Sequence, residues 1–424
     1  METNKYRITK YACYTAYFTM SSIFCVPPLL FVTFRELYGI SYTLLGTLVL
    51  VNFCTQLGID LVFTACSRWI DAKKVVRAMP LVTALGMLIY ALIPNLFPEA
   101  AYGGLLTGTI VFSVSAGFSE VLLSPVIAAI PSENPQRDMS MLHSLYAFGA
   151  FTMIVISTVF LSVFGAENWL YLFLFLAALP VIAAVLFMLS PMPDMSGGGT
   201  EPSQERREKG RMPGLLLCVA CIFFGSCAEN AMSNWVSTYA ENALGIGKAV
   251  GDILGAAMFA ILLGVARIAY AKFGKNICKT LLLSMIGAAV CYLTVGLSSG
   301  TVLPFVACML TGLFTSMLWP GSLIMMEEKL PGATVSAFAL MAAGGDLGAS
   351  IAPQLLGVVI DKVSASELGI RLAHTLNISP EQIGLRAGML LTALFPMIGI
   401  GTVLAVMRYF RKPHKENALS KSIS

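Results

Sequence analysis

Several ionisable residues of this chain stand inside long apolar stretches. Glu120 lies in "GFSEVLLSP" (117–125), within a run from 101 to 130 that has no other charge. Asp60, Glu229 and Arg267 stand in comparable stretches. At bilayer depth a charged side chain costs about 2.5 kcal/mol or more, so such residues face water or one another and commonly mark a transport pathway.

The residues around Glu120 predict one polar stripe on a helix. Ser113, Gly117, Glu120 and Ser124 recur at intervals of three or four residues, which places them on one face. We expect this face to line a hydrated cavity. Burial favours the protonated form of a carboxyl group, which suits a proton carrier. The alternative is a structural acid that holds two helices together by hydrogen bonds.

A second stripe runs along the stretch from 43 to 66. Asn52, Gln56 and Asp60 repeat every four residues. We predict that Asp60 takes part in proton coupling and that it forms a conformational ion pair with Arg267 from the other half of the chain. A permanent structural pair is the alternative.

The richest polar surface lies in "SCAENAMSNWVSTYAEN" (226–242), next to Trp235. Hydroxyl, amide and carboxylate groups beside an aromatic ring suit a carbohydrate, and they would also suit an amino acid or a cationic drug. Helix packing is the alternative for these residues. The predicted substrate-binding residues are Glu120, Glu229, Asn230, Ser233, Trp235, Asn52, Gln56 and Tyr146.

Two further ionisable residues are predicted to have structural roles. Asp346 lies in "AAGGDLGAS", whose glycines permit close helix approach. His143 opens the fifth apolar stretch, near the interface, where a capping role is expected. Chemistry at Asp346 and proton shuttling by His143 are the alternatives. Pro27-Pro28 and Trp319-Pro320-Gly321 predict bends in the first and tenth stretches.

The composition requires a membrane for these stretches. The 424 residues are 57% hydrophobic and 12% charged, about half the charged fraction of a soluble domain. A helix needs about 20 apolar residues to cross a bilayer. Twelve stretches qualify: 11–33, 43–66, 78–95, 101–130, 142–165, 168–190, 214–238, 249–271, 279–298, 302–326, 334–360 and 385–408.

Charge placement predicts the orientation and the domains. Most of the 27 Lys and Arg residues fall on one side when both termini are cytoplasmic, which indicates a multi-pass protein of the cell membrane. We predict an N-terminal six-helix bundle (1–190), a polar cytoplasmic linker (191–213) and a C-terminal six-helix bundle (214–424). On the opposite side, Leu368, Leu372 and Leu376 predict a short amphipathic helix.

The two halves show weak internal similarity, with Pro125 and Gly149 falling on Pro320 and Gly344 at one offset. Duplicated six-helix halves are typical of transporters. With "CSRWIDAKKVVR" (66–77) after the second stretch and "ARIAYAKFGKN" (266–276) in the second half, the whole chain resembles the major facilitator superfamily. This resemblance implies an all-α membrane protein of twelve transmembrane helices in two pseudo-symmetric bundles, working by alternating access.

Within that superfamily the chain looks most like the sugar permeases that include fucose permeases. "SEVLLSP" (119–125), "LHSLYAFG" (142–149) and "AMSNW" (231–235) carry this resemblance. It implies that Glu120 corresponds to a carboxylate used there in sugar binding and proton coupling. The stretch from 11 to 33 holds no Asp or Glu, so the two-carboxylate scheme of that family is not carried over.

The residues point away from other classes of protein. The sequence has no spacing typical of a metal site, a nucleotide loop, a catalytic triad or a nucleic-acid surface, so we expect no enzyme activity and no cofactor. We predict a secondary transporter that moves a small polar solute, such as a sugar, with a proton or sodium ion, as a monomer in the lipid bilayer. Multidrug or metabolite efflux and a non-transporting membrane sensor are the alternatives.

Overall fold

The computed structural model describes residues 5–66, 69, 71–193, 212–331 and 335–411 and is almost entirely helical. The first half contains α2 (Arg7–Leu29), α3 (Phe31–Tyr38), α4 (Tyr42–Cys66), α5 (Ala72–Leu96), η1 (Pro98–Ala100), α6 (Ala101–Ala129), α7 (Pro135–Phe164), η2 (Ala166–Asn168), α8 (Trp169–Leu176) and α9 (Ala178–Leu189). The second half contains α11 (Met212–Thr238), η4 (Tyr239–Ala243), α12 (Lys248–Val250), η5 (Gly251–Ala257), α13 (Met258–Phe273), α14 (Ile277–Leu297), α15 (Val302–Thr315), α16 (Leu318–Lys329), α17 (Val335–Ala365), α18 (Glu367–Leu376), α19 (Pro380–Thr392) and α20 (Leu394–Tyr409).

These helices give the twelve predicted spans. Within the described residues, ten helical segments are long and apolar enough to cross a membrane, and the bent pair of α2 and α3 makes eleven. The 30-residue helix α7, which includes the apolar segment Phe148–Phe164, supplies the twelfth. The twelve-helix fold class is confirmed.

The bend predicted for the first stretch is confirmed, whereas in the tenth stretch the structure shows an interruption of the helix. The axis turns by 53° between α2 and α3, directly after Pro27 and Pro28. A proline removes a backbone donor and clashes with the preceding turn, so a helix bends or ends near it. The tenth span breaks between Thr315 and Leu318, just before Pro320.

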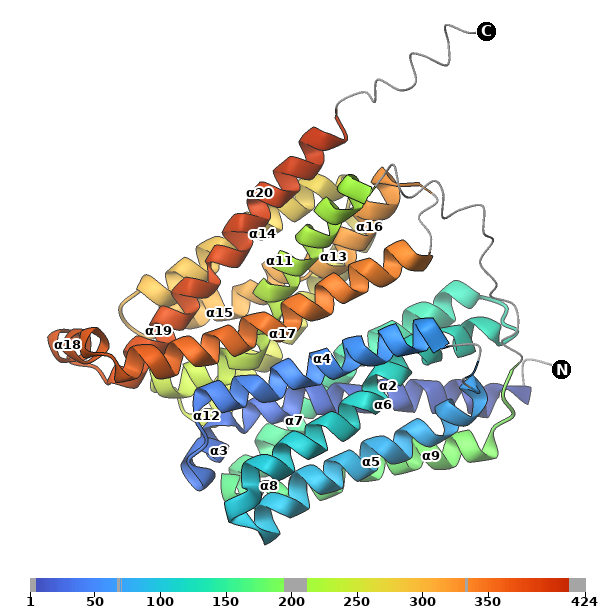
Figure 1. The fold of residues 1–424 in the computed structure, drawn as a ribbon, viewed down its shortest axis with the longest axis horizontal. Helices are drawn as coiled ribbons and strands as arrows, with labels where there is room; N and C mark the ends of the chain where they lie inside the picture. The colour runs from blue at the N-terminus through green and yellow to red at the C-terminus, as the bar shows by residue number, and fades with distance from the viewer. Residues whose placement is uncertain (1–4, 67–68, 70, 194–211, 332–334, 412–424) are drawn as a thin grey trace, which may run out of the picture.

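The helices form two groups in space, α2–α9 (the first bundle) and α11–α20 (the second bundle) (Figure 1). The bundles meet along a seam in which α4 contacts α17, α2 contacts α11, and α7 contacts η5 and α13. The exact domain boundaries stay a prediction, because most of the predicted linker (194–211) lies outside the described residues.

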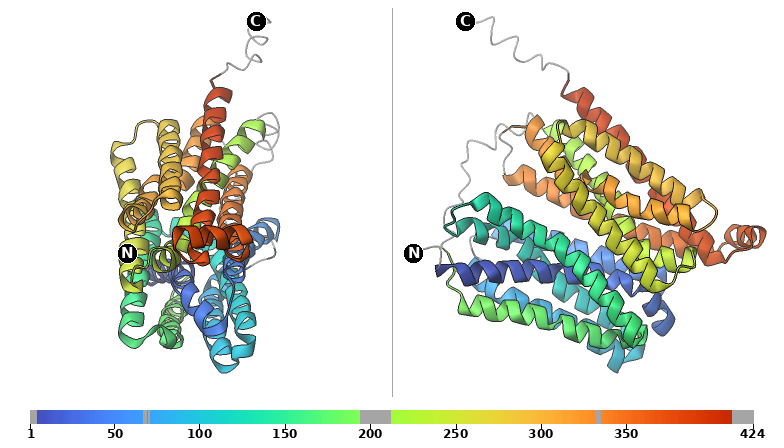
Figure 2. Two further views of the ribbon diagram at one scale, coloured as in Figure 1. Left: turned by 90° about the vertical axis from the view of Figure 1, so that its left-hand side faces the viewer. Right: turned by 180° about the vertical axis from the view of Figure 1, so that it is seen from behind.

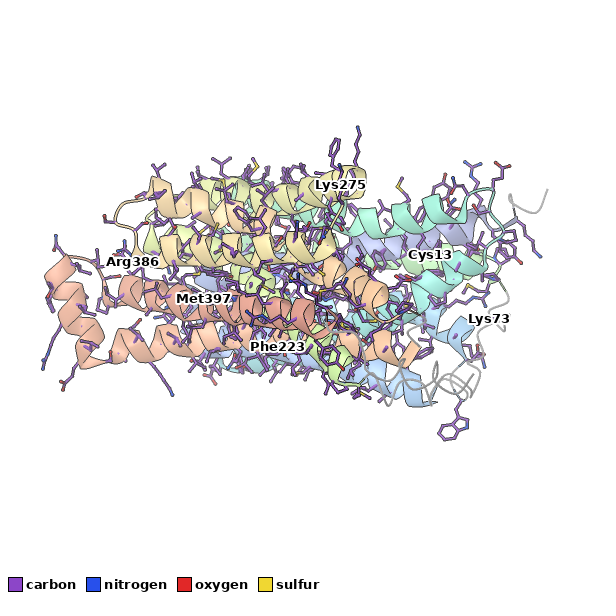
Figure 3. All side chains as sticks on the ribbon, turned by 90° about the horizontal axis from the view of Figure 1, so that it is seen from above. Cys13, Lys73, Phe223, Lys275, Arg386 and Met397 are labelled. Atoms are coloured by element: carbon purple, nitrogen blue, oxygen red, sulfur yellow. The ribbon has the colours of Figure 1, made fainter. Side chains whose placement is uncertain are left out.

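The bundles lie closest at the end that carries α18 and diverge towards the end where α2 begins and α20 finishes (Figure 2). We call these the α18 end and the termini end. The predicted amphipathic helix is confirmed as α18, capped by the Ser366 side chain. Figure 3 shows Lys73 and Lys275 towards the termini end and Arg386 towards the α18 end.

The seam is tightly packed at the α18 end. A Cβ atom on Gly46 would lie 2.8 Å from Oε1 of Gln354, and one on Gly357 would lie 2.3 Å from the carbonyl oxygen of Tyr42. Glycine at these positions therefore lets α4 and α17 approach backbone to backbone, as small residues do in membrane interfaces.

Polar contacts join the bundles at the same end. The carboxylate of Asp361 accepts hydrogen bonds from the backbone N–H groups of Tyr42 (3.2 Å) and Thr43 (2.6 Å), at the start of α4. The Tyr42 hydroxyl donates to Glu381, which lies 3.6 Å from Arg35. Lys248 of the second bundle donates to the carbonyl oxygen of Leu29 in the first. We call this set the α18-end lock.

Candidate functional site

A cavity of about 380 Å³ lies at the seam, within the usual range for small-molecule sites. Both bundles contribute to its wall. The first bundle supplies Tyr17, Met20, Phe24, Cys25, Leu29, Asn52, Phe53, Gln56, Glu120, Tyr146, Ala150 and Ile154. The second supplies Glu229, Asn230, Ser233, Asn234, Ala256, Phe259, Ala260, Leu263, Arg267, Trp319 and Asp346.

The two predicted polar stripes of the first bundle contact each other, but of Ser113, Gly117, Glu120 and Ser124 only Glu120 lines the cavity, and Ser113 and Gly117 are buried against α4. The Oδ1 atom of Asn52 accepts hydrogen bonds from Ser113 Oγ (2.6 Å) and Gln56 Nε2 (3.0 Å). A Cβ atom on Gly117 would lie 2.9 Å from Cβ of Ile59, so this glycine lets α6 pack closely on α4. Glu120, one turn beyond Gly117, lines the cavity as the sequence predicts.

Helix α11 presents the expected polar surface to the cavity. Glu229, Asn230 and Ser233 all line it, and so does Asn234, which the sequence analysis did not single out. Asn234 Nδ2 donates to the carbonyl oxygen of Asn230 (2.9 Å), so this amide is oriented by its own helix. The sequence offered one signal that Asn234 could line the cavity, namely its position directly after the predicted residue Ser233.

Arg267 pairs with a different carboxylate from the one we expected. Its Nη2 atom lies 3.4 Å from Oε1 of Glu229, and its Nε atom donates to the carbonyl oxygen of Ser316 (2.9 Å). The predicted pair between Asp60 and Arg267 is therefore not formed in this conformation. It would have to bridge the two bundles near the termini end, where they diverge, whereas Glu229 belongs to the same bundle as Arg267.

Asp60 lies one turn beyond Gln56 along α4, outside the residues that line the cavity. The charge of Glu120 acts on it, so the two acids are electrostatic neighbours. Tyr146 lines the cavity as predicted. His143 belongs to α7, but its side chain lies outside the described part of the structure.

Trp235 is not part of the cavity wall. The side chain is fully buried, its Nε1 atom donates to the carbonyl oxygen of Pro353 (3.1 Å), and its ring packs on Phe31 and Tyr42. It lies on a different face of α11 from Glu229, because residues six apart on a helix are separated by about 120° around the axis. The tryptophan that reaches the cavity is Trp319 of α16.

Aromatic rings form the wall of the first bundle beside Glu120. Phe24 packs against Phe53 and Tyr146 with ring centroids 5.6 and 5.9 Å apart, and Tyr17 packs on Tyr146 at 6.4 Å. Trp319 and Phe259 lie in the wall of the second bundle. The cavity therefore combines amides and carboxylates with ring faces, a surface that binds polar groups at their edges and apolar groups by stacking.

A family described as Major Facilitator Superfamily matches residues 12–353 of this chain. No curated protein sequence matches it.

Solved structures share the fold over nearly the whole chain. A bacterial homologue of the human lysosomal transporter Spinster, in an inward-facing and unoccupied conformation, has 12% identity and a TM-score of 0.76, covering 95% of this chain and 96% of that one. A D-xylose–proton symporter has 13% identity and a TM-score of 0.72, covering 92% and 96%. The E. coli fucose:proton symporter has 13% identity and a TM-score of 0.55, covering 93% and 99%.

Proposed function

Because this chain belongs to the major facilitator superfamily and is a multi-pass membrane transporter, we propose that it carries a small polyhydroxylated solute, with a sugar as the first candidate, coupled to protons. The observation that supports this proposal most is the cavity at the seam. It is walled by both bundles, so a solute bound there touches both and its access changes when they rock.

The chemistry of the wall supports a sugar. Asn52, Gln56, Asn230 and Asn234 offer amide donors and acceptors, and Glu120 offers a carboxylate that accepts from hydroxyl groups. Trp319 and Tyr146 offer ring faces for the C–H side of a pyranose. Two of the structures with the same fold are sugar–proton symporters, which is the class proposed here.

We propose that the conformation described here is open towards the cytoplasm. The contacts of Asp361, Glu381 and Lys248 with the first bundle lie at the α18 end, where the lock closes the seam. Among the described residues, Lys and Arg are more frequent in the segments at the termini end, which include Lys73 and Lys275, and this favours a cytoplasmic position for that end. Alternating access then requires the α18-end lock to open and the termini end to close.

Glu120 is the proposed proton carrier of the first bundle, with Asp60 as its electrostatic neighbour. Its carboxyl group lines the cavity among apolar and amide side chains, where a negative charge is poorly solvated. Proton binding removes this charge, so the protonated and ionised forms favour different arrangements of the bundles. A proton gradient can drive the solute through this difference.

Uptake into proteoliposomes tests the function. A panel of labelled monosaccharides, polyols, nucleosides and organic amines is offered with and without an imposed pH gradient, acidic outside. We expect one sugar or polyol to accumulate above its external concentration only with the gradient, and a protonophore to abolish this accumulation. Binding or uptake of amines alone, or uptake indifferent to the gradient, would contradict the proposal.

The Glu120→Gln variant tests its role. It should exchange solute across the vesicle membrane but lose gradient-driven accumulation. Glu367→Gln is the matched control, because Glu367 is an exposed acid of α18 that pairs with Arg371 away from the cavity. A Glu120→Gln variant that accumulates solute like the parent would show that Glu120 is only structural.

A further inference from the structure

The second bundle contributes two acids to the cavity wall, Glu229 and Asp346. Glu229 pairs with Arg267, whereas Asp346 has no cationic partner among the described residues. The residue is 8% exposed, and its Oδ2 atom is buried with no hydrogen-bond partner in the described part of the chain. Asp346 nevertheless lines the cavity, in the middle of α17. A buried, unpartnered carboxyl that faces a cavity needs either a proton or a ligand.

The neighbouring glycines hold Asp346 in this position. A Cβ atom on Gly345 would lie 2.5 Å from Nε1 of Trp319, and one on Gly348 would lie 2.3 Å from the carbonyl oxygen of Phe223. These close approaches press α17 against α16 and α11. The glycines of "AAGGDLGAS" therefore have the packing role predicted from the sequence, while the Asp346 carboxyl between them is left to the cavity.

The charges in the cavity do not balance. Among the described lining residues, Glu120, Glu229 and Asp346 are acids and Arg267 is the one permanent cation. Arg267 is already paired with Glu229. Glu120 and Asp346 therefore share the cavity without a counter-charge, and the charges of both Glu120 and Asp60 act on Asp346.

A proton satisfies this arrangement better than a metal ion. Two carboxyl groups that share a cavity without a cation do not both ionise readily, so we expect one of them to hold a proton. Within the described residues, no three His, Cys, Asp or Glu side chains converge as metal ligands. The ionisable groups around Asp346 in or beside the cavity are Tyr17, Cys25, Asp60, Glu120, Tyr146, Glu229 and Arg267.

We propose that Asp346 is a second proton-coupling residue, and that Asp346 and Glu120 form a carboxyl pair across the seam, one from each bundle. This inference rests on the proposed function, since it assumes proton coupling. Protons from the aqueous side to which the cavity opens bind one carboxylate oxygen and leave to water on the other side. Because the partners belong to different bundles, their repulsion when ionised changes with the distance between the bundles.

Infrared difference spectroscopy of the purified, reconstituted protein tests the pair, with the proton itself as the probe and no solute present. We expect the carbonyl band of protonated carboxyl groups to disappear as the pH is raised. Asp346→Asn should remove one component of this band and Asp346→Glu should retain it. In Glu120→Gln the Asp346 component should disappear at a more acidic pH, because the neighbouring negative charge is gone.

Glu367→Gln is the control and should leave the titrating band unchanged. The inference is overturned if Asp346→Asn loses no component of the band, or if Glu120→Gln leaves the titration of Asp346 where it was. If Asp346→Asn does not fold, the titrations of Glu120→Gln and Asp346→Glu still test whether Asp346 and Glu120 form a pair. Carboxyl groups that stay ionised throughout would indicate a bound cation instead and would also overturn it.

Transport separates this inference from the proposed function. In proteoliposomes Asp346→Asn should lose gradient-driven accumulation of the solute found in the uptake panel while exchange continues. If the parent responds to the gradient and Asp346→Asn responds equally, the inference fails and the proposed function stands. If the parent does not respond at all, both fail.

Discussion

The α18-end lock offers a direct test of how this transporter closes. Asp361 belongs to the second bundle, yet its carboxylate accepts from the first two N–H groups of α4 in the first bundle. The N-terminal N–H groups of a helix have no partners within the helix and carry a partial positive charge, so they favour an anion. Asp361→Ala removes this contact between the bundles.

The size of the effect follows from the geometry. Opening the α18 end exposes both the carboxylate and the N–H groups to water, so only the net value of the hydrogen bonds counts. Loss of a capping side chain costs about 0.5–2 kcal/mol. Since the 2.6 Å contact to Thr43 is a short bond to a charged acceptor, we take about 2 kcal/mol, the upper end of that range. About 2 kcal/mol corresponds to roughly a 30-fold shift of the equilibrium towards the state open at the α18 end.

Electron–electron distance measurements across the α18 end provide the assay. Spin labels at Leu37 in α3 and Leu368 in α18 report the separation of the bundles, since both positions are exposed. Native cysteines are replaced beforehand. We expect a longer distance to gain population in Asp361→Ala. Asp71→Ala is the matched control, because Asp71 accepts from the N–H groups of Lys73 and Lys74 at the start of α5 within one bundle.

One result would refute this reasoning. If Asp361→Ala and Asp71→Ala give the same distance distribution as the parent, the contact of Asp361 with α4 does not stabilise the closed α18 end. An equal shift in both variants would attribute the effect to general loss of helix capping. Only a shift confined to Asp361→Ala supports a lock between the bundles.

Three further predictions concern particular side chains. In a double-mutant cycle on transport KM, the effects of Glu229→Gln and Arg267→Ala should be non-additive by about 1 kcal/mol, a modest coupling because the Arg267 side chain is 36% exposed. The effects of Asp60→Asn and Arg267→Ala should be additive. The reverse result would support a pair of Asp60 with Arg267. Trp235→Phe should lower the free energy of unfolding by about 1 kcal/mol, because the hydrogen bond to the Pro353 carbonyl is lost, and should leave KM unchanged. Trp319→Phe should raise KM, because Trp319 lines the cavity. A raised KM in Trp235→Phe would contradict the placement of that ring. Gly149→Ala should lower the free energy of unfolding by about 1–3 kcal/mol, because its Cβ atom would lie 2.3 Å from Ser21 Oγ. Gly103→Ala is the control, since a Cβ atom there would meet nothing within 4 Å. Equal melting temperatures of the two variants would refute this prediction.

The sequence was sufficient for the twelve spans, the bend of the first span and α18. Apolar runs of about 20 residues, prolines and a leucine repeat are local signals, and the bilayer makes them decisive because every backbone polar group must be satisfied within the helix. The cavity-facing positions of Glu120, Asn52 and Gln56 could be predicted for a related reason. Amide and carboxyl side chains on an apolar helix need water or a polar partner, whereas the smaller Ser113 of the same stripe is satisfied by hydrogen bonds to Asn52 and to its own helix.

The choice of partners could not be predicted in this way. The sequence analysis predicted a pair of Arg267 with Asp60 from the other half of the chain, but the guanidinium pairs with Glu229 of its own bundle. Likewise, Trp235 lies in the polar sequence of α11 but on the face that packs against Phe31 and Tyr42, and Trp319 reaches the cavity in its place. Both outcomes depend on helix rotation, which packing decides.

By itself, the sequence determined that this chain crosses the membrane many times and carries acids at depth, since hydropathy and the cost of burying charge act residue by residue. Only the tertiary structure decided which acids share a cavity, which of them finds a cation, and that Asp346 faces Glu120's cavity without one. These facts depend on how two bundles approach each other. Contacts between distant segments leave no local pattern in a single sequence.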